Sequence, residues 1–504
     1  MNGLLQLRSK VGFVAAVVVI GAVWRLWLGS QYAGWEESDY GNLAMIRGVL
    51  DGGFRHYDMN HMPGYYGLAA VFMWLLDDAQ LAARLVSLVG GLVALGIAVG
   101  LADDLWGRTV AVVCALVLMF QPEFALYSAS SLREPLYCAF VMGCLAGALH
   151  NRWGWVGFAA AAAFLVRFDA MFVLPPVFAF SLWGRGALSW CKALGPLVVA
   201  VMGWAIYCQI DHGTWVFWSH SVAVNLDTGM GAEQVTAIGW GLAGLRVVGG
   251  LLFELLPSRI GWGIAFGLLW ALLGLRRFGM EVPRVWSLLG LMMLGFWASV
   301  GFVGQHSPEH NLYWKWLAPV VPVVVPLGVV GLMRLARLIG KVAGSGAKGL
   351  FLLVVIGQAL LGHVQETQRQ VQLSQVLYAP QRDLGVWFED EVDSGSVLLV
   401  DNIPACWINR RSHERRMISW FDVPVEGGDG LAFASWLRHN EVAWVLWFRE
   451  SWTQAPVVAP FLREGGVWTK GGLRLRETNR EDEYGWILFA VEPQPGRDPL
   501  EQKP

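Results

Sequence analysis

Residues 35–66 read WEESDYGNLAMIRGVLDGGFRHYDMNHMPGYY and form the first polar stretch of the chain, directly after its first apolar run. Three carboxylates lie within four residues here, on Glu36, Glu37 and Asp39. Further charged and imidazole side chains precede the break at Pro63-Gly64, namely Arg55, His56, Asp58 and His61. Acids that can accept a proton are thus placed near cations that can hold an anion, as a group-transfer site requires. An ordinary solvated loop is the alternative.

The composition excludes an ordinary soluble protein. Of the 504 residues, 55% are hydrophobic and only 15% are charged, which is far from the usual balance of soluble domains. Apolar runs of roughly 17–25 residues, long enough to cross a bilayer, recur through the first 365 residues. The formal net charge of -2 and the scattered basic residues give no sign of nucleic-acid binding. The composition therefore predicts a polytopic α-helical membrane protein.

We expect about eleven transmembrane helices, because this number places the basic residues between spans on one side, as the positive-inside rule requires of the cytoplasm. The expected spans are Val11–Gly29, Leu81–Leu101, Thr109–Ala125, Pro135–Leu149, Trp153–Val166, Ala170–Trp183, Ala193–Ile210, Ile260–Leu275, Val285–Val303, Leu317–Met333 and Gly349–His363. Pro63–Leu76 is too short to cross, so we expect a helix that lies on the surface or dips into it. Leu242–Leu256 is marginal and is left out.

This topology places the polar candidate segments on the opposite, outer face. These segments are residues 30–80, 126–134, 167–169, 211–259, 304–316 and everything after 365. No nucleotide sugar is available outside the plasma membrane. A transferase on that face therefore needs a donor that a membrane lipid has already carried across.

From about residue 380 the chain changes character. Runs rich in β-branched and aromatic residues predict strands at Ser396–Asp401, Val442–Phe448 and Gly485–Glu492. Amphipathic patterns predict helices at Asp383–Glu391 and Leu431–Asn440. We therefore expect three parts: a transmembrane domain over residues 1–365, a small α/β domain outside the membrane over 380–495, and a polar tail over 496–504.

The order of these features resembles the GT-C superfamily of polyprenyl-phosphate-sugar glycosyltransferases. One span, an acidic loop, a Pro-Gly-Tyr re-entry at residues 63–65, many spans and a small extracytoplasmic domain follow one another. The pattern is most similar to bacterial relatives of protein O-mannosyltransferases and to aminoarabinose transferases that modify lipid A. The resemblance covers roughly residues 1–365 as an ordered set of weak motifs. It implies a GT-C-like fold with periplasmic surface helices in the bacterial inner membrane, and places the active face and the C-terminal domain in the periplasm.

Individual motifs carry this resemblance. The acidic pair of the family's first loop corresponds to Glu36-Glu37-Ser38-Asp39-Tyr40, and the basic residue at the donor phosphate corresponds to His61 in His61-Met62-Pro63-Gly64-Tyr65. The later motifs correspond to Arg133-Glu134, Arg167-Phe168-Asp169-Ala170 and Lys315-Trp316-Leu317-Ala318-Pro319. The chain departs from the family at Glu36, which replaces Asp, at Met62, which replaces a proline, and at His61 and Lys315, which replace other cations. Lysine cannot make the bidentate contact of arginine.

The resemblance implies an enzyme that moves a hexose or pentose from a polyprenyl-phosphate-linked donor to a hydroxyl of a glycan, lipid or protein, with inversion. It makes Glu36 the expected base and Glu37 the group that orients the acceptor, and Asp39 is a third catalytic candidate. The cations expected at the donor phosphate are His61, Lys315, Arg167, Arg133 and Arg84. The acceptor or sugar contacts are expected from Tyr40, Tyr65, Glu134 and Asp169. From the residues alone, the three early carboxylates are equivalent.

Several of these candidates have a structural alternative. Asp39 suits the first turn of a helix, and Lys315 suits a membrane interface, where its ammonium group reaches water. The other ionisable candidates could pair or anchor a span: Arg133 with Glu134, Arg167 with Asp169, and Arg84 at the start of the second span. Ionisable groups within or at the ends of membrane-spanning segments are costly, however, unless they serve a site.

No cofactor is firmly expected. Binding of a divalent cation remains an alternative, because His306, Glu309 and His310 are close in sequence. Their spacing, however, matches no metal signature. Two alternatives to the enzyme remain, a non-catalytic GT-C relative and a multi-span transporter or flippase of lipid-linked sugars. A transporter is expected to show inverted repeats and charges near mid-membrane, whereas the charges here gather at the outer ends of spans.

Overall fold

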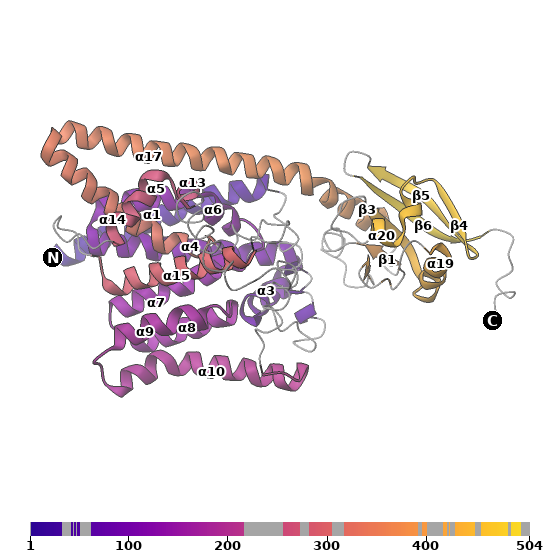
Figure 1. Cartoon of the computed structure of the whole chain (residues 1–504), viewed down its shortest axis with the longest axis horizontal. Coiled ribbons are helices and arrows are strands. Elements are labelled where there is room, and N and C mark those ends of the chain that lie inside the picture. The colour runs from indigo at the N-terminus through magenta and orange to yellow at the C-terminus, as the bar shows by residue number, and fades with distance from the viewer. Residues whose placement is uncertain are drawn as a thin grey trace, which may run out of the picture. The chain divides into compact units, whose positions relative to one another are not determined.

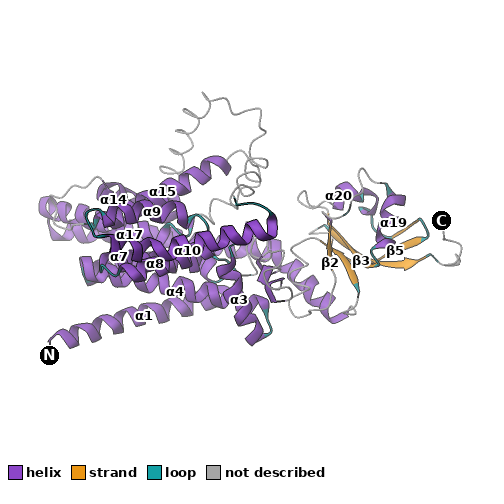
Figure 2. Ribbon diagram, turned by 90° about the horizontal axis from the view of Figure 1, so that it is seen from below, coloured by secondary structure: helices purple, strands orange, loops and turns teal. Residues whose placement is uncertain are grey.

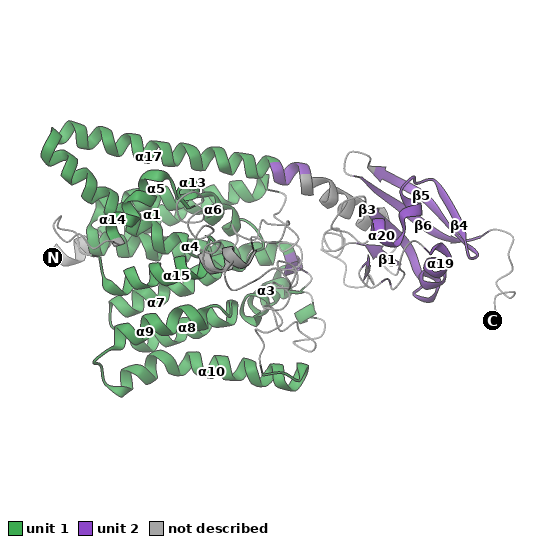
Figure 3. Cartoon of the chain, in the orientation of Figure 1, with its two compact units in different colours: residues 1–32, 45–76, 80–372 green, residues 33–44, 77–79, 373–504 purple. Residues whose placement is uncertain are grey.

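Most of the described chain is helical, because backbone groups in an apolar layer must find their hydrogen-bond partners within the same segment. The computed structural model describes residues 2–32, 42–43, 45–46, 48–50, 62–215, 256–272, 282–304, 317–391, 396–400, 417–420, 423, 429–448, 455–481 and 485–494. The chain divides into two compact units: unit 1 holds residues 1–32, 45–76 and 80–372, and unit 2 holds residues 33–44, 77–79 and 373–504 (Figure 3).

Unit 1 is a bundle of helices (Figure 1). Its described helices are α1 (Asn2–Gln31), α3 (Pro63–Leu76), α4 (Ala79–Trp106), α5 (Arg108–Phe120), α6 (Pro122–Ser128), α7 (Glu134–Leu149), α8 (Trp153–Val166), α9 (Ala170–Leu182), α10 (Ala187–His212), α13 (Leu256–Ile260), α14 (Trp262–Leu272), α15 (Arg284–Gly304) and the first part of α17 (Val321–Glu391). The most extensive packing places α8 between α7 and α10, and α15 lies against α9.

Helix lengths bear on the expected spans. Within the described residues, four helices are long and apolar enough to cross a membrane, or five if the bent pair α5 and α6 is one span. Helices α7, α8 and α9 are apolar but have 16, 14 and 13 residues, which is about 20–24 Å at 1.5 Å per residue against a hydrocarbon layer of about 30 Å. A multi-pass helical membrane protein is confirmed, and the number of eleven spans stays a prediction.

One expected span, Thr109–Ala125, is broken in the structure. Helices α5 and α6 meet at a 65° bend. The bend lies at Gln121, where the backbone is extended and the side chain accepts a hydrogen bond from the N–H of Phe124. Pro122 at the first position of α6 needs no hydrogen-bond partner for its nitrogen, so the second helix begins there in a new direction.

The last two expected spans form one element, α17. Its two arms, residues 321–343 and 345–391, join at Gly344, whose backbone (φ 89°, ψ 169°) is not helical and is favoured by glycine alone. We call these the inner arm and the outer arm. Every residue from 317 to 334 is buried. Gly331 packs so closely on Gly267 of α14 that a Cβ atom there would collide with the Gly267 carbonyl, which is the small-residue packing typical of membrane helices.

Unit 2 contains one mixed sheet (Figure 2). Its strands are β1 (Val397–Val400), β2 (Met417–Ser419), β3 (Val442–Phe448), β4 (Val467–Lys470), β5 (Leu473–Glu481) and β6 (Trp486–Pro493), in the order β2-β1-β3-β6-β5-β4. Strand β1 is parallel to β2 and β3, and the other pairs are antiparallel. The short helices are α19 (Gly430–His439), α20 (Ala455–Val458) and η4 (Pro460–Leu462).

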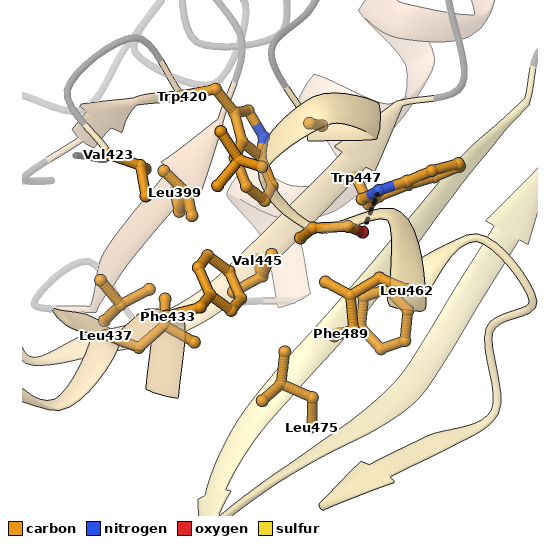
Figure 4. Close-up of a cluster of buried hydrophobic side chains, with 14 of the residues drawn as sticks. Leu399, Trp420, Val423, Phe433, Leu437, Val445, Trp447, Leu462, Leu475 and Phe489 are labelled. Atoms are coloured by element: carbon orange, nitrogen blue, oxygen red, sulfur yellow. Dashed lines mark hydrogen bonds between the residues drawn. The ribbon is translucent and has the colours of Figure 1, made fainter. Parts of the chain in front are cut away.

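Aliphatic and aromatic side chains together fill the core of unit 2 (Figure 4). Trp420 stacks on Phe433 of α19, and the indole N–H of Trp447 donates to the carbonyl of Ala459 at 3.0 Å. The three expected strands are present as β1, β3 and β6, and the expected helix Leu431–Asn440 is present as α19. Residues 383–391 are helical as expected, but they continue α17 and do not form a separate helix.

Candidate functional site

Several helix ends from distant parts of the sequence meet at one end of unit 1, which we call the site end. Arg84 of α4 donates to the carbonyls of Gly29 and Tyr32, at 2.9 and 3.1 Å, and so ties α4 to the end of α1. Ser87 donates to the carbonyl of Leu132 at 2.6 Å, which adds the turn between α6 and α7. Arg84 therefore links the start of α4 to the end of α1, and its role at a donor phosphate stays a prediction.

Arg167 joins the next pair of helix ends. Its Nη1 donates to Glu134 Oε1 at 2.6 Å, and its Nε donates to Asp169 Oδ1 at 2.9 Å. The guanidinium also lies over the ring of Tyr137, 5.6 Å from its centroid. Glu134, Arg167 and Asp169 are 0%, 3% and 3% exposed. One buried cation therefore pairs with two buried carboxylates, and such pairing makes buried charges tolerable.

Local sequence explains where these side chains stand. Glu134 lies in the first turn of α7 and precedes Pro135, and an acid is favoured there by the helix dipole. Arg167 is the residue that ends α8, and its extended backbone (φ -148°, ψ 126°) leads into the turn before α9. The Oε2 atom of Glu134 is buried and has no hydrogen-bond partner in the described part of the chain.

Arg133 has a different setting from that of its neighbour. Its Nε lies 4.0 Å from Glu134 Oε1, at the limit of an ion pair, and its side chain is 20% exposed. Arg167 is held by two carboxylates and Arg84 by two carbonyls. Of these three predicted phosphate-binding arginines, Arg133 is therefore the one whose guanidinium is most available to a ligand.

Tyr65 of α3 lies at the same end but has a closed environment. Its side chain is fully buried, and its hydroxyl is 3.1 Å from the carbonyl of Ala83 and 3.1 Å from the hydroxyl of Ser87. Tyr65 thus connects α3 to α4. Gly64 lets α3 approach α8 closely, because a Cβ atom there would lie 2.7 Å from the carbonyl of Leu165.

The remaining predicted site residues lie outside the described residues. They are Glu36, Glu37, Asp39, Tyr40, His61 and Lys315, together with the open metal candidates His306, Glu309 and His310. The structure therefore brings Arg133, Glu134, Arg167 and Asp169 together and adds Arg84 and Tyr65 to the same end. The proposed roles of all these residues stay predictions.

A second charged cluster was not predicted. Arg259 of α13 contacts Glu123 Oε1 at 3.0 Å and Glu366 Oε1 at 2.6 Å through one nitrogen, Nη1. The side-chain amide of Gln121 also donates to Glu123. One feature of the sequence indicated this cluster: Glu123 is a charged residue inside an expected span, and charged residues there usually have a functional or pairing role. Within the described residues, no group of three or more His, Cys, Asp or Glu side chains could hold a metal ion.

Comparisons with known proteins agree on the architecture. The sequence model of the family described as dolichyl-phosphate-mannose-protein mannosyltransferase matches residues 60–211. The crystal structure of ArnT from Cupriavidus metallidurans bound to undecaprenyl phosphate matches with a TM-score of 0.62 and 13% identity, over 95% of this chain and 98% of that chain. The apo state of the same ArnT matches with a TM-score of 0.61 and 13% identity, over 96% and 98%. No curated protein matches by sequence.

A weaker structural match is the arabinofuranosyltransferase AftD from Mycobacteria. Its TM-score is 0.46 at 12% identity, over 94% of this chain and 40% of that chain. The matches to ArnT extend over nearly the whole length of both chains. At this level of identity, they establish the fold.

Proposed function

We propose that this chain, a membrane protein with the GT-C fold, is a glycosyltransferase that moves a sugar from a polyprenyl-phosphate-linked donor to an acceptor hydroxyl on the outer face of the membrane. The observation that supports this most is the buried cluster of Arg133, Glu134, Arg167 and Asp169. It lies within residues 60–211, the stretch that the mannosyltransferase family model matches. Ionisable groups held at helix ends in a membrane bundle usually serve a site.

The proposed reaction is a single displacement with inversion. The acceptor oxygen attacks the anomeric carbon, the bond from that carbon to the phosphate oxygen breaks, and the lipid phosphate leaves with the bonding electron pair. Glu36 takes the proton of the acceptor hydroxyl, Glu37 orients the acceptor, and Asp39 supplies further negative charge near the oxocarbenium-like transition state. Cations must stabilise the departing phosphate.

Among the proposed phosphate ligands, Arg133 has the strongest structural support. It is partly exposed and only loosely paired, whereas Arg167 is fully engaged by Glu134 and Asp169. We therefore assign direct phosphate contact to Arg133, together with His61 and Lys315. Arg167 acts as a positioning residue, because it fixes the first turn of α7 through Glu134 and thereby fixes the adjacent Arg133.

Sugar and acceptor contacts are proposed for Tyr40, Asp169 and Glu134. The unpaired buried oxygen of Glu134 can accept a hydrogen bond from a hydroxyl group, whereas the hydroxyl of Tyr65 already has two neighbours. The ArnT that shares this fold was crystallised with undecaprenyl phosphate. We therefore propose undecaprenyl phosphate or a close polyprenyl relative as the lipid of the donor.

The test replaces the early carboxylates. Glu36→Gln and Glu37→Gln, combined in the full chain, should abolish transfer from an undecaprenyl-phosphate sugar, while binding of undecaprenyl phosphate and the thermal unfolding midpoint stay unchanged. Asp104→Asn is the matched control, because Asp104 is a half-exposed carboxylate that pairs with Lys10 away from the proposed site, and it should retain full transfer. Transfer that persists in the double variant would reject this catalytic assignment.

A further inference from the structure

The outer arm of α17 buries a row of polar side chains. His363, Thr367 and Gln370 share one face of the helix and are 3%, 2% and 5% exposed. Within the described residues, the two ring nitrogens of His363, Thr367 Oγ1 and Gln370 Oε1 have no hydrogen-bond partner. Buried polar atoms in proteins are almost always paired. This face, which we call the polar seam, therefore points to a ligand that makes these bonds.

The charges beside the polar seam are balanced. Gln370 donates from Nε2 to Glu366 at 2.7 Å, and Glu366 is also bound by Arg259 and Arg369. The ring of His363 lies near the backbone of Arg259, whose side chain pairs with Glu123 as well. Two carboxylates thus stand against two guanidinium groups. A ligand of the polar seam is accordingly neutral.

The chemistry of the three side chains narrows the ligand further. An imidazole both donates and accepts, a hydroxyl does the same, and the free amide oxygen of Gln370 accepts. Within the described residues no cluster of metal-binding side chains is present. A group that offers several donors and acceptors without charge is a polyhydroxylated ring, which is the chemistry of a sugar.

The length of the outer arm is consistent with a site near a membrane surface. Residues 344 to 366 of the outer arm span about 33 Å at 1.5 Å per residue, and the hydrocarbon layer is about 30 Å thick. The polar seam is therefore one membrane thickness away from the Gly344 turn. That depth is where the sugar of a lipid-linked donor, or of an acceptor that approaches it, is found.

The outer arm is also packed in a way that permits it to move. Between residues 345 and 376, whose side chains the structure describes, Ala359 is the one buried apolar residue. Leu350, Leu353 and Leu361 on the arm are 60–71% exposed. Few apolar contacts hold this arm, but the ion pair between Glu366 and Arg259 must open for a ligand to reach the polar seam.

We propose that the polar seam binds a sugar ring through His363, Thr367 and Gln370, a site that rests on the proposed glycosyltransferase function. The sugar belongs either to the lipid-linked donor or to the acceptor. Both present the same hydroxyl groups, and separate titrations of the two substrates distinguish them.

The test uses Thr367→Val, which removes the hydroxyl and keeps the size of the side chain. The KM for one substrate, donor or acceptor, should rise about 2- to 10-fold, the equivalent of one lost hydrogen bond, and the other KM should not change. A substrate analogue that lacks the sugar hydroxyl bound by Thr367 should be used equally well by Thr367→Val and wild type. Thr109→Val, at an exposed position at the start of α5, is the matched control.

Two results separate failure of the polar seam from failure of the function. If wild type transfers sugar and Thr367→Val leaves both KM values and the preference over the deoxy analogue unchanged, the inference is wrong and the function stands. If wild type transfers nothing, the proposed function fails. The polar seam is then tested by thermal unfolding of wild type and Thr367→Val in the presence of free hexoses and pentoses. Stabilisation of wild type that Thr367→Val lacks supports the polar seam, and equal behaviour of the two proteins overturns it.

Discussion

Arg133 and Glu134 are neighbours in the chain, but the structure gives them opposite surroundings. Glu134 is completely buried and bound to Arg167 at 2.6 Å. Arg133 is partly exposed, and its nearest carboxylate oxygen is 4.0 Å away. Arg133 is therefore the more available of the two to a ligand, whereas Glu134 is held in place by its ion pair with Arg167. Two single substitutions separate these roles.

Glu134→Gln should lower the free energy of unfolding by about 1.5–3 kcal/mol, because it weakens the charge-assisted hydrogen bond to the buried Arg167. Arg133→Met should change that free energy by less than about 1 kcal/mol, because the nearest described carboxylate oxygen lies 4.0 Å away, at the limit of an ion pair, and loose pairs contribute little. It should weaken undecaprenyl phosphate binding about tenfold or more. Thermal unfolding and direct binding measurements on the full chain check both values.

Arg152→Met is the control for Arg133→Met, since Arg152 is an exposed arginine at the turn between α7 and α8. Arg152→Met should change neither the free energy of unfolding nor the binding of undecaprenyl phosphate. If Arg133→Met unfolds the protein as readily as Glu134→Gln does, the division of roles between the two neighbours is wrong.

At the scale of single residues, the sequence identified charged side chains at helix ends but not their partners. Arg167 with Asp169 was an expected pair, because the two residues are adjacent in one turn. The pairing of Arg167 with Glu134 and of Arg259 with Glu123 and Glu366 joins residues 33 to 136 positions apart. Such partners depend on how the helices pack, which periodicity and spacing in one sequence do not encode.

Helices α14 and α17 meet through glycine, and this contact decides how closely they pack. Gly331→Ala should lower the free energy of unfolding by about 3 kcal/mol or more, because the added methyl group collides with the Gly267 backbone and the helices must separate. Thermal unfolding in detergent measures the effect.

Gly357→Ala provides a matched control on the same helix. A Cβ atom at Gly357 meets nothing within 4 Å, so the substitution should change the free energy of unfolding by less than about 1 kcal/mol. Equal destabilisation by both substitutions would show that helix packing at Gly331 is not the cause.

At the scale of elements, the sequence predicted most helices and strands but few of their interruptions. The expected span Thr109–Ala125 contains Pro122 between Gln121 and Glu123, which is a signal for a helix break, but hydropathy alone does not register it, so the 65° bend was not anticipated. Strand β5 was missed because its alternation of apolar and charged residues ends after Leu475, and strand β4 was missed because it has only four residues. Strand β2 has only three residues.

At the scale of the whole molecule, each of the two units has a core of its own. In unit 2, Asp429 caps α19 by accepting hydrogen bonds from the N–H groups of Leu431 and Ala432, at 3.0 and 3.2 Å. Asp429→Ala should lower the local stability of α19 by about 1 kcal/mol. Hydrogen exchange on the full chain should become faster in α19 and stay unchanged in α7 and α8.

Asp429→Asn tests the cause, because asparagine caps a helix about as well as aspartate and should keep the exchange of α19 slow. Faster exchange in α7 or α8 after Asp429→Ala would show that the two units do not unfold independently.

The overall division into a membrane bundle and a terminal α/β part was predictable from hydropathy. The continuity of α17 into residue 391 was not, because a polar stretch can continue a helix without any change of pattern.

The enclosed inner arm of α17 has a consequence for biosynthesis. Every residue from 317 to 334 is buried, yet the ribosome delivers this segment after most of the other described helices of unit 1. The earlier helices enter the bilayer before the neighbour that they enclose exists, so they cannot reach their final contacts in the order of translation. We therefore expect insertion of this chain to involve a rearrangement, in which helices already in the membrane move apart to admit residues 317–334.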